Sequence, residues 1–267
     1  MSTITIKALT DYLESIAPLA LQEDYDNAGL LVGDATAEID RALISLDVTP
    51  DVVNEAADKG YKLIIAHHPV IFRGLKRLTG ETYVEQAVIM AIRRDIAIYA
   101  IHTNLDNVLQ DGVNGEIAGR IGLIDTEVLS PLESSGDNGH GAGVIGAMPE
   151  SVTEGAFLAH LRETMKLQSF RHTQLTGRIV GKVAVCGGSG SFLLPKAIAA
   201  GAQVYVSADF KYHEFFDANG KILIADIGHY ESERFTMDLI ADLIRRKFPT
   251  FAAQLTTIVT NPITYYP

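Results

Sequence analysis

Short apolar runs alternate with amphipathic stretches along most of the chain. The apolar runs have the length and composition of buried β-strands, and the amphipathic stretches carry apolar residues at helical spacing. This alternation predicts βαβ units, a largely parallel sheet and an α/β fold. Strands are expected at residues 41–47, 62–66, 96–101, 182–185, 203–206, 221–225 and 256–259, and helices at 5–17, 50–59, 81–94, 111–121 and 231–246, with two more following Glu154 and Ser191.

Residues with defined capping chemistry mark several helix boundaries. Thr49 before Pro50 is an N-cap followed by proline at the first helical position. Gly60 suits the C-cap of the same helix, because glycine adopts a left-handed conformation without strain. Residues 151–154, Ser-Val-Thr-Glu, have the form of a capping box and predict a further helix after them.

Two segments of the chain share one pattern of strands and helix, and we call this match the internal echo. Residues 42–68, moved by 141 positions, fall on residues 183–209 without a gap, so that strand matches strand and helix matches helix. Ala56 falls on Ala197, and Gly60 falls on Gly201. The identities are few, and two unrelated βαβ units are the competing explanation. The gap-free match favours duplication into two related α/β lobes, the second inserted before the chain returns to the first.

A segment rich in Ser, Gly, Pro and Asp at residues 130–143 is the best candidate for the crossover to the second lobe. We therefore expect the first lobe to comprise residues 1–128 and 227–267, and the second lobe to comprise residues 129–226. With these boundaries the first lobe carries most of the candidate metal ligands described below.

Composition and charge restrict the classes of function. The chain has 267 residues, 47% of them hydrophobic, which is enough for a sizeable core. No apolar run reaches the roughly 18 residues of a membrane helix, and residues 1–9 are too polar for a signal peptide. The single cysteine, Cys186, excludes a disulfide framework and a cysteine-rich zinc site, and fits the reducing cytoplasm. A net charge of −11 disfavours nucleic acid as a partner.

Ionisable side chains gather just beyond the ends of predicted strands, where ligands bind in open α/β sheets. His67 and His68 are adjacent before Pro69, so both imidazoles can reach one site from two sides, which suits two ions better than one. His229 and Glu233 lie four apart at the start of a helix and share a face. The segments concerned are residues 66–69, 101–106, 207–213 and 228–233.

Each of these motifs alone has an ordinary explanation as a hydrogen-bonded polar residue or a turn. Their joint occurrence at several strand ends favours a metal site. A carboxylate such as Asp106 can bridge two ions, and histidine with carboxylate but no thiolate suits Zn, Mn, Fe or Co.

Several neighbours are candidates for tuning such a site. His102 and His213 are candidates for proton transfer or for orienting ligands, with loop orientation alone as the alternative. Asp209 is positioned to accept a hydrogen bond from a ligand imidazole.

Two further features leave their roles open. Arg73, Lys76 and Arg77 could meet a phosphate or form a solvated surface run. The run 186–191, Cys-Gly-Gly-Ser-Gly-Ser, could cradle a phosphate, but it lacks the ending of a P-loop and is interpreted mainly as a tight turn.

Six motifs in a fixed order resemble one protein family. The motifs are DYDNAGLLVGD, AHHPVIF, HTNLDN, GAGVIGAMPE, SADFKYH and DIGHYESE, and they extend from Asp24 to Glu233. They resemble the GTP cyclohydrolase I type 2 homologue family, also called the Nif-three-like proteins. Two positions depart from the family pattern: Tyr25 stands where the family often has Trp, and Ala208-Asp209 stands where it often has Gly-Asp.

The resemblance implies the short form of this family, without an inserted domain. Its fold is then two similar, intertwined three-layer α/β/α lobes with mixed sheets, assembled into a ring-shaped homohexamer. The resemblance also implies two divalent metal ions per chain, with His67, His68, Asp106, His229 and Glu233 as their ligands.

The leading functional hypothesis is metal-dependent hydrolysis of a small anionic substrate, a nucleotide or a phosphoester, with His102 or His213 moving the proton. The family name points to GTP cyclohydrolase-type chemistry. Two alternatives involve no turnover. One is a metal-binding or metal-delivery protein, and the other is a ring-shaped interaction scaffold. Neither nucleic acid nor a membrane is an expected partner.

Overall fold

The computed structural model describes residues 3–132 and 139–266 and divides into two compact units. Unit 1 comprises Met1–Leu105 together with Thr236–Pro267, and unit 2 comprises Asp106–Phe235. The second unit is therefore inserted in the sequence of the first. Within the described ranges no helix has the length and apolarity needed to cross a membrane.

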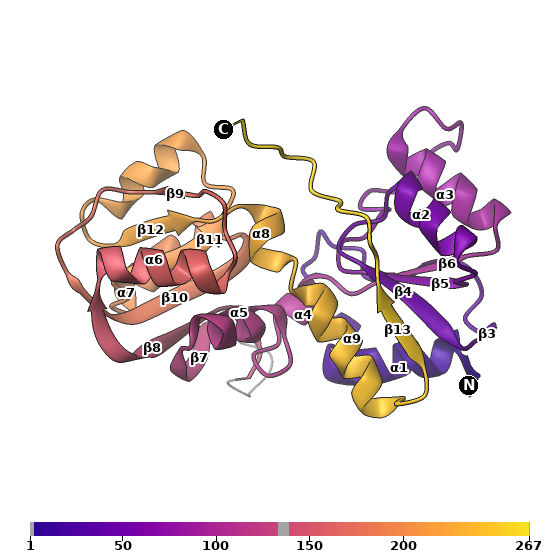
Figure 1. Cartoon of the computed structure of the whole chain (residues 1–267), viewed down its shortest axis with the longest axis horizontal. Coiled ribbons are helices and arrows are strands. Elements are labelled where there is room, and N and C mark those ends of the chain that lie inside the picture. The colour runs from indigo at the N-terminus through magenta and orange to yellow at the C-terminus, as the bar shows by residue number, and fades with distance from the viewer. Residues whose placement is uncertain (1–2, 133–138, 267) are drawn as a thin grey trace. The chain divides into compact units, whose positions relative to one another are not determined.

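Unit 1 is built on a five-stranded mixed sheet with the order β13-β4-β5-β6-β2 (Figure 1). The first four of these strands run parallel, and β2 pairs with β6 in the antiparallel sense. The elements of unit 1 are β1 (Ile4–Thr5), α1 (Ile6–Ile16), η1 (Leu19–Leu21), β2 (Gly29–Val32), β3 (Glu38–Ile39), β4 (Arg41–Ser45), α2 (Pro50–Asp58), β5 (Leu63–Ala66), α3 (Tyr83–Arg93), β6 (Ala97–Ala100), α9 (Thr236–Lys247) and β13 (Ala252–Leu255).

Helices cover both faces of this sheet. Figure 1 shows α2 and α3 on one face and α1 and α9 on the other. The core under α2 and α3 is formed by alternate strand residues such as Leu43 and Ile64 together with Val52 and Ala87 of the helices, all fully buried. The predicted N-cap of α2 is present, because the Thr49 hydroxyl accepts a hydrogen bond from the amide of Val52. The C-cap is Lys59 rather than Gly60, which follows it with a left-handed φ of +74°.

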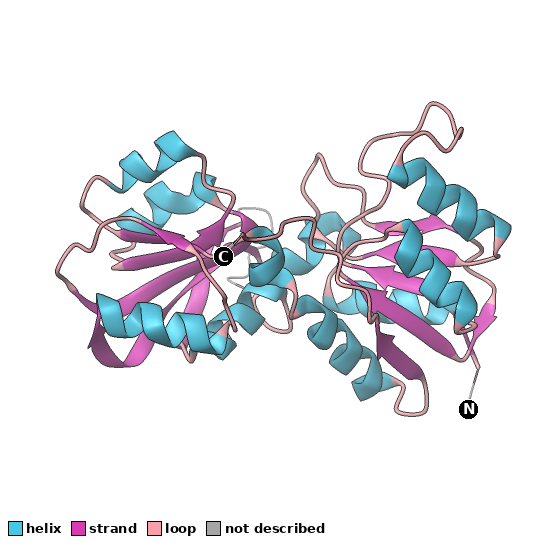
Figure 2. Ribbon diagram, turned by 45° about the horizontal axis from the view of Figure 1, so that its top comes forward, coloured by secondary structure: helices cyan, strands magenta, loops and turns pink. Residues whose placement is uncertain are grey.

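Unit 2 is built on a six-stranded mixed sheet with the order β7-β8-β10-β11-β12-β9. The pairs β10–β11 and β11–β12 are parallel, and the other three are antiparallel. Figure 2 shows helices on both sides of this sheet, so unit 2 also has three layers. Its elements are α5 (Val113–Ile121), β7 (Ile124–Pro131), β8 (Gly141–Thr153), α6 (Glu154–Thr164), β9 (Arg171–His172), β10 (Ile179–Ser189), η2 (Ser191–Leu193), α7 (Leu194–Ala199), β11 (Val204–Ala208), η3 (Tyr212–Ala218), β12 (Leu223–Asp226) and α8 (His229–Glu233).

The echo between residues 42–68 and 183–209 is present in the structure. Moved by 141 positions, α2 falls on η2 and α7, and β4 and β5 fall on β10 and β11. The strand register is also the same, since Leu43 pairs with Ile64 as Ala184 pairs with Tyr205. Because register is set by each sheet separately, this agreement supports the prediction of two related units.

The unit boundaries differ from the predicted ones. Residues 106–128 and 227–235, expected in the first lobe, belong to unit 2. The reason is packing: α5 contacts β8 and β10, β7 pairs with β8, and α8 contacts β10 and β11. The segment 130–143 is therefore a connection between two strands of one sheet and not a crossover, and its residues 133–138 lie outside the described ranges.

Three element predictions at helix and strand ends are corrected. The N-cap of α6 is Thr153 and not Ser151, because β8 continues up to Thr153. The helix expected over residues 231–246 is divided into α8 and α9, where the chain passes from unit 2 to unit 1. The last strand is β13 rather than residues 256–259. It pairs with β4, and the last residue pair between them is Leu255 with Ile44.

Candidate metal centre

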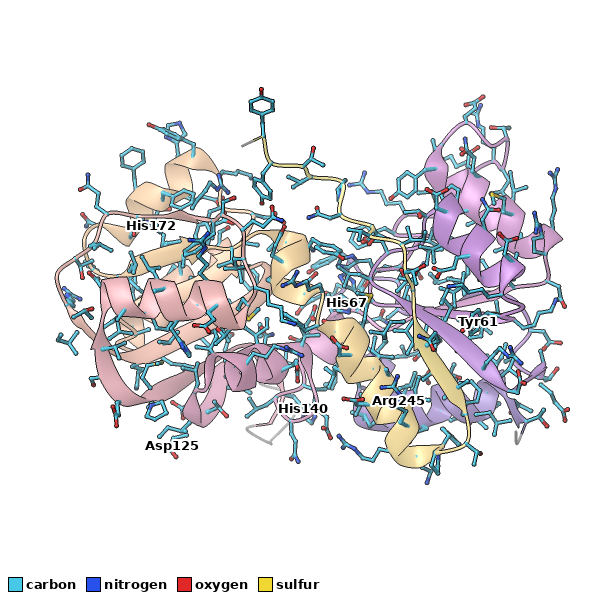
Figure 3. All side chains as sticks on the ribbon, in the orientation of Figure 1. Tyr61, His67, Asp125, His140, His172 and Arg245 are labelled. Carbon is cyan, nitrogen blue, oxygen red and sulfur yellow. The ribbon has the colours of Figure 1, made fainter. Side chains whose placement is uncertain are left out.

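Two adjacent histidines follow the end of β5 in unit 1. His67, labelled in Figure 3, donates from Nδ1 to the carbonyl oxygen of Ile101 at 2.8 Å. His68 directs Nδ1 to Oδ1 of Asp47, also at 2.8 Å. A carbonyl oxygen can only accept, so the neutral His67 ring carries its proton on Nδ1, and Nε2 is the nitrogen suited to a metal. Such anchoring of the other ring nitrogen is typical of metal-binding histidines.

His102 joins these two histidines in unit 1. Its ring centroid lies 5.3 Å from those of both His67 and His68. One nitrogen from each of the three rings lies within 4.8 Å of the other two, so this cluster could hold a metal ion. The sequence interpretation placed His102 outside the ligand set, as a candidate for proton transfer.

Asp26 fixes the His102 ring. Its carboxylate lies 2.8 Å from Nδ1 of His102 and also accepts hydrogen bonds from the amide and hydroxyl of Thr103. Burial alone would raise the pKa of Asp26, but the hydrogen bonds from His102 and Thr103 outweigh it and lower the pKa to about 2. Asp26 is therefore ionised and holds His102 through Nδ1.

Unit 2 contributes a histidine between two carboxylates. Nδ1 of His229 lies 2.7 Å from Oδ2 of Asp209, and Nε2 lies 3.0 Å from Oε2 of Glu233. Burial would lower the pKa of His229, but the charge of Glu233 and the hydrogen bond to Asp209 raise it to about 11. These surroundings favour positive charge beside Nε2, which a divalent cation would supply. The expected sharing of a helix face by His229 and Glu233 is confirmed.

The loop after β11 supplies the carboxylate that anchors His229. Asp209 adopts a left-handed conformation with φ of +58°, which aspartate tolerates better than most residues. Ala208 fits its position without strain, because Asp209 and not Ala208 takes the left-handed conformation. In the internal echo, Asp209 corresponds to His68, so both units place a polar side chain at the same strand end.

The glycine-rich run, residues 186–191, packs against the side chain of Glu233. It is not the predicted tight turn, because β10 continues to Ser189. A Cβ atom on Gly188 would lie 2.3 Å from Oε1 of Glu233, so only glycine allows this approach. The amide of Gly188 donates to Ser232 and the amide of Gly187 donates to Asn114. Because both amides serve the fold, the alternative of a phosphate cradle loses these two donors.

Asp106 is held from the backbone in unit 2. The side-chain amide of Asn114 donates to the carbonyl oxygen of Asp106 at 3.0 Å. Burial raises the pKa of the nearby Cys186 thiol to about 12, and the charges of Asp106 and Glu233 add to this rise. The thiol is therefore protonated, and Cys186 is a buried small residue beside two carboxylates.

A model of the Duf34/NIF3 (NGG1p interacting factor 3) family matches residues 4–264. The chain belongs to this family. A Lactococcus lactis relative is 37% identical over 87% of this chain and 88% of its own, and a Clostridium acetobutylicum relative is 32% identical over 86% of each chain. Both carry the name GTP cyclohydrolase 1 type 2 homolog.

The solved structures agree with this membership of the NIF3 family. The crystal structure of a Staphylococcus aureus hypothetical protein superposes with a TM-score of 0.91 at 29% identity, covering 98% of this chain and 99% of that one. A Bacillus cereus protein related to NIF3 superposes with a TM-score of 0.89 at 24% identity, covering 100% of both chains. The mixed α/β fold with mixed sheets is therefore that of a NIF3 protein.

The other predicted residues of this NIF3 chain lie elsewhere. His213 is exposed in η3, where its ring stacks on Phe216 with centroids 6.3 Å apart. No cluster of three donor atoms found among the described residues includes it. The loop that follows His67 and His68 carries three exposed cationic residues, Arg73, Lys76 and Arg77.

Sequence reasoning missed three supporting residues, namely Asp47, Asp26 and Asn114. Asp47 stands just beyond β4, so the rule that drew attention to other strand ends could have found it. Asp26 and Asn114 carried no such signal. Their roles depend on hydrogen bonds to residues far away in the sequence, such as His102 and Gly187.

Proposed function

We propose that this NIF3 protein holds two divalent metal ions with His67, His68, Asp106, His229 and Glu233 and uses them to hydrolyse a small anionic substrate. The observation that carries the proposal is the shared anchoring of the imidazoles. His67, His68 and His229 are each held through Nδ1 by a carbonyl or carboxylate oxygen, which directs Nε2 to a ligand. This pattern in both units is the supporting geometry expected of metal ligands.

The covalent chain supports the participation of both units. It passes from unit 1 to unit 2 after Leu105 and returns before Thr236. Asp106 follows His102 by four residues, a reach of at most about 14 Å, and Glu233 precedes Thr236 by three, a reach of about 10 Å. Candidate ligands therefore lie within a few residues of both crossings.

The chemistry follows from the donor set. A pair of divalent ions would supply Lewis acidity and lower the pKa of a water molecule toward neutrality. Around it, the chain's own residues hold and move protons. Asp26 fixes the His102 ring through Nδ1 at 2.8 Å, so Nε2 of His102 is the atom assigned to accept or return a proton. Asp209 and Asp47 keep the rings of His229 and His68 oriented.

Turnover by the metal-loaded protein tests the hydrolase proposal. Phosphate or product release would be measured on phosphoesters and nucleotides, including GTP, after loading with Zn, Mn, Fe or Co. We expect His102→Gln to lower kcat by about 10²- to 10⁴-fold while metal content is retained. The exposed His172, changed to Gln, is the matched control. Metal loading without turnover on any substrate would contradict hydrolysis and favour metal binding or delivery. The role assigned to His213 stays a prediction, which His213→Ala tests in the same assay.

A further inference from the structure

Two exposed aromatic rings stand beside the histidine cluster of unit 1. Tyr25 is 63% exposed and Phe72 is 43% exposed, and their ring centroids lie 6.1 Å apart. The Phe72 ring also lies 6.3 Å from the ring of His102 in an edge-on arrangement. Contiguous apolar patches on a folded surface can mark binding sites, and these two rings lie next to a candidate proton-transfer residue.

The tripeptide 25–27 builds this arrangement. The carboxylate of Asp26 holds His102, as described above. The side-chain amide of Asn27 donates to the carbonyl oxygen of Ile71 at 2.6 Å, next to Phe72 in the sequence. Tyr25 therefore adjoins two residues that tie it both to the histidine cluster and to the loop that carries Phe72. The backbone that carries each ring is therefore next to a residue fixed by a hydrogen bond.

The same loop carries positive charge. Arg73, Lys76 and Arg77 are exposed, and within residues 3–132 and 139–266 none of them has an ion-pair partner. In a chain with a net charge of −11, three such cations within five positions form a local site for an anion. Arginine in particular suits phosphate, because its planar group donates two parallel hydrogen bonds.

We propose that Tyr25 and Phe72 stack on the planar base of a nucleotide and that Arg73, Lys76 and Arg77 bind its phosphates. The proposal rests on the proposed function, since it makes a nucleotide the substrate class of the metal centre. Stacking on aromatic side chains tolerates any base, because every base has a π-face. A phosphoester without an aromatic group would use the cations but not the two rings.

Titration calorimetry on the full-length protein separates the two parts of this site. The probes are GMP, guanosine and inorganic phosphate, each measured on the protein with and without its metal ions. We expect Phe72→Ser to weaken binding of GMP and guanosine by about 5- to 100-fold and to leave phosphate binding unchanged. The double change Arg73→Gln and Arg77→Gln is expected to weaken GMP and phosphate but not guanosine.

Matched controls use residues of the same unit with similar exposure. Tyr83, 61% exposed at the start of α3, is changed to Ser, and the exposed Arg93 is changed to Gln. Lack of GMP binding by the unchanged protein, or an equal loss in the Tyr83→Ser control, would overturn the proposal. A change in oligomer mass in Phe72→Ser with unchanged GMP affinity would also overturn it and assign the rings to contact with a second copy.

The metal-free measurement distinguishes this inference from the proposed function. Guanosine binding that depends on Phe72 but survives removal of metal would support the stacking site even if no hydrolysis is found. Turnover that is unchanged in Phe72→Ser on nucleotides would leave the hydrolase intact and contradict the stacking site.

Discussion

Single hydrogen bonds to Nδ1 decide which nitrogen each imidazole presents. His67 uses the carbonyl of Ile101, while His68 and His229 use the carboxylates of Asp47 and Asp209. A carboxylate partner also makes the ring more basic and so a stronger ligand. The metal affinity proposed for this site would therefore depend on Asp47 and Asp209, which are not among its proposed ligands.

Asp209→Asn tests this dependence. The amide keeps the size of the side chain but removes the charge that orients His229, so metal affinity is expected to fall about 10- to 100-fold. Competition with a chelator of known affinity measures it. Asp217→Asn, an exposed carboxylate of the same unit, is the control. Equal affinities in all three proteins would show that Asp209 has no supporting role.

Glu55 provides a test of stability away from the metal centre. Burial would raise its pKa, but Lys59, Thr256 and Thr257 donate hydrogen bonds that lower it to about 2, from an ordinary value of 4.5. A carboxylate whose pKa is lower in the folded state stabilises the folded protein at pH values above its pKa in the unfolded chain. This stabilisation, about 1–3 kcal/mol, is therefore fully present above pH 4.5 and is lost as the pH falls toward 2.

Urea unfolding of Glu55→Gln between pH 7 and pH 3 checks this. The variant is expected to be less stable than the unchanged protein at pH 7, and the difference should shrink below about pH 4.5. Asp58→Asn on the same helix is the control, since Asp58 is exposed. A difference that stays constant across this pH range would contradict the assigned carboxylate role.

At the residue scale, sequence patterns predicted the candidate ligands and one supporting residue, Asp209, which the bond to His229 confirms, but not the other supports. Four candidate ligands could be predicted because they follow strand ends or share a helix turn, namely His67, His68, His229 and Glu233. The role of Asp26 could not be predicted, because its partner His102 lies 76 positions away and no local pattern encodes that pairing.

Element ends carry the candidate ligands, and close packing positions them. Helix α8 begins after Gly228, whose φ of +91° only glycine adopts readily, and it lies against the end of β10. Gly188 allows that contact, because a side chain there would meet Glu233. The glycine-rich run therefore positions the helix that carries His229 and Glu233.

Gly188→Ala is expected to displace Glu233 and remove bound metal. Gly201→Ala is a matched control, since both glycines have positive φ, but nothing lies within 4 Å of an added Cβ at Gly201. Both variants should lose about 1–2 kcal/mol through the left-handed backbone. Only Gly188→Ala should lose metal in elemental analysis, and full metal content in that variant would contradict the positioning role.

Helices and buried strands were largely predictable, because their periodicity and caps are local. The capping of α2 by Thr49 and the parallel strands β4, β5 and β6 follow the sequence pattern. The last strand was misplaced because residues 256–259 are all β-branched and so favour a strand, whereas Thr256 and Thr257 bond to Glu55 instead. Which of two neighbouring segments becomes the strand is decided by tertiary contacts.

The chain divides into two compact units, one inserted in the sequence of the other. The match between residues 42–68 and 183–209 could be found in the sequence because its strands and helix align without a gap. The unit boundaries were not, because the packing of α5 and α8 on the sheet of unit 2 is a tertiary property. The ring-shaped homohexamer implied by family resemblance stays a prediction.

Metal removal is expected to destabilise the protein, because ions that bind only the folded chain stabilise it. At a metal concentration 100 times the dissociation constant, binding stabilises by about 2.7 kcal/mol, so chelation should lower Tm by roughly 5–10 °C. Reloading should restore it, and Glu233→Ala should not respond to the chelator. An unchanged Tm after complete removal of metal would contradict a role of the ions in stability.

The central claim is the proposal that His67, His68, Asp106, His229 and Glu233 hold a pair of metal ions. Elemental analysis of the purified protein tests it most directly, beside His68→Ala from unit 1, Glu233→Ala from unit 2 and the exposed control His172→Ala. We expect about two ions per chain in the unchanged protein and the control, and fewer in both ligand variants. No bound metal even after incubation with Zn, Mn, Fe and Co, or full content in either ligand variant, would contradict it.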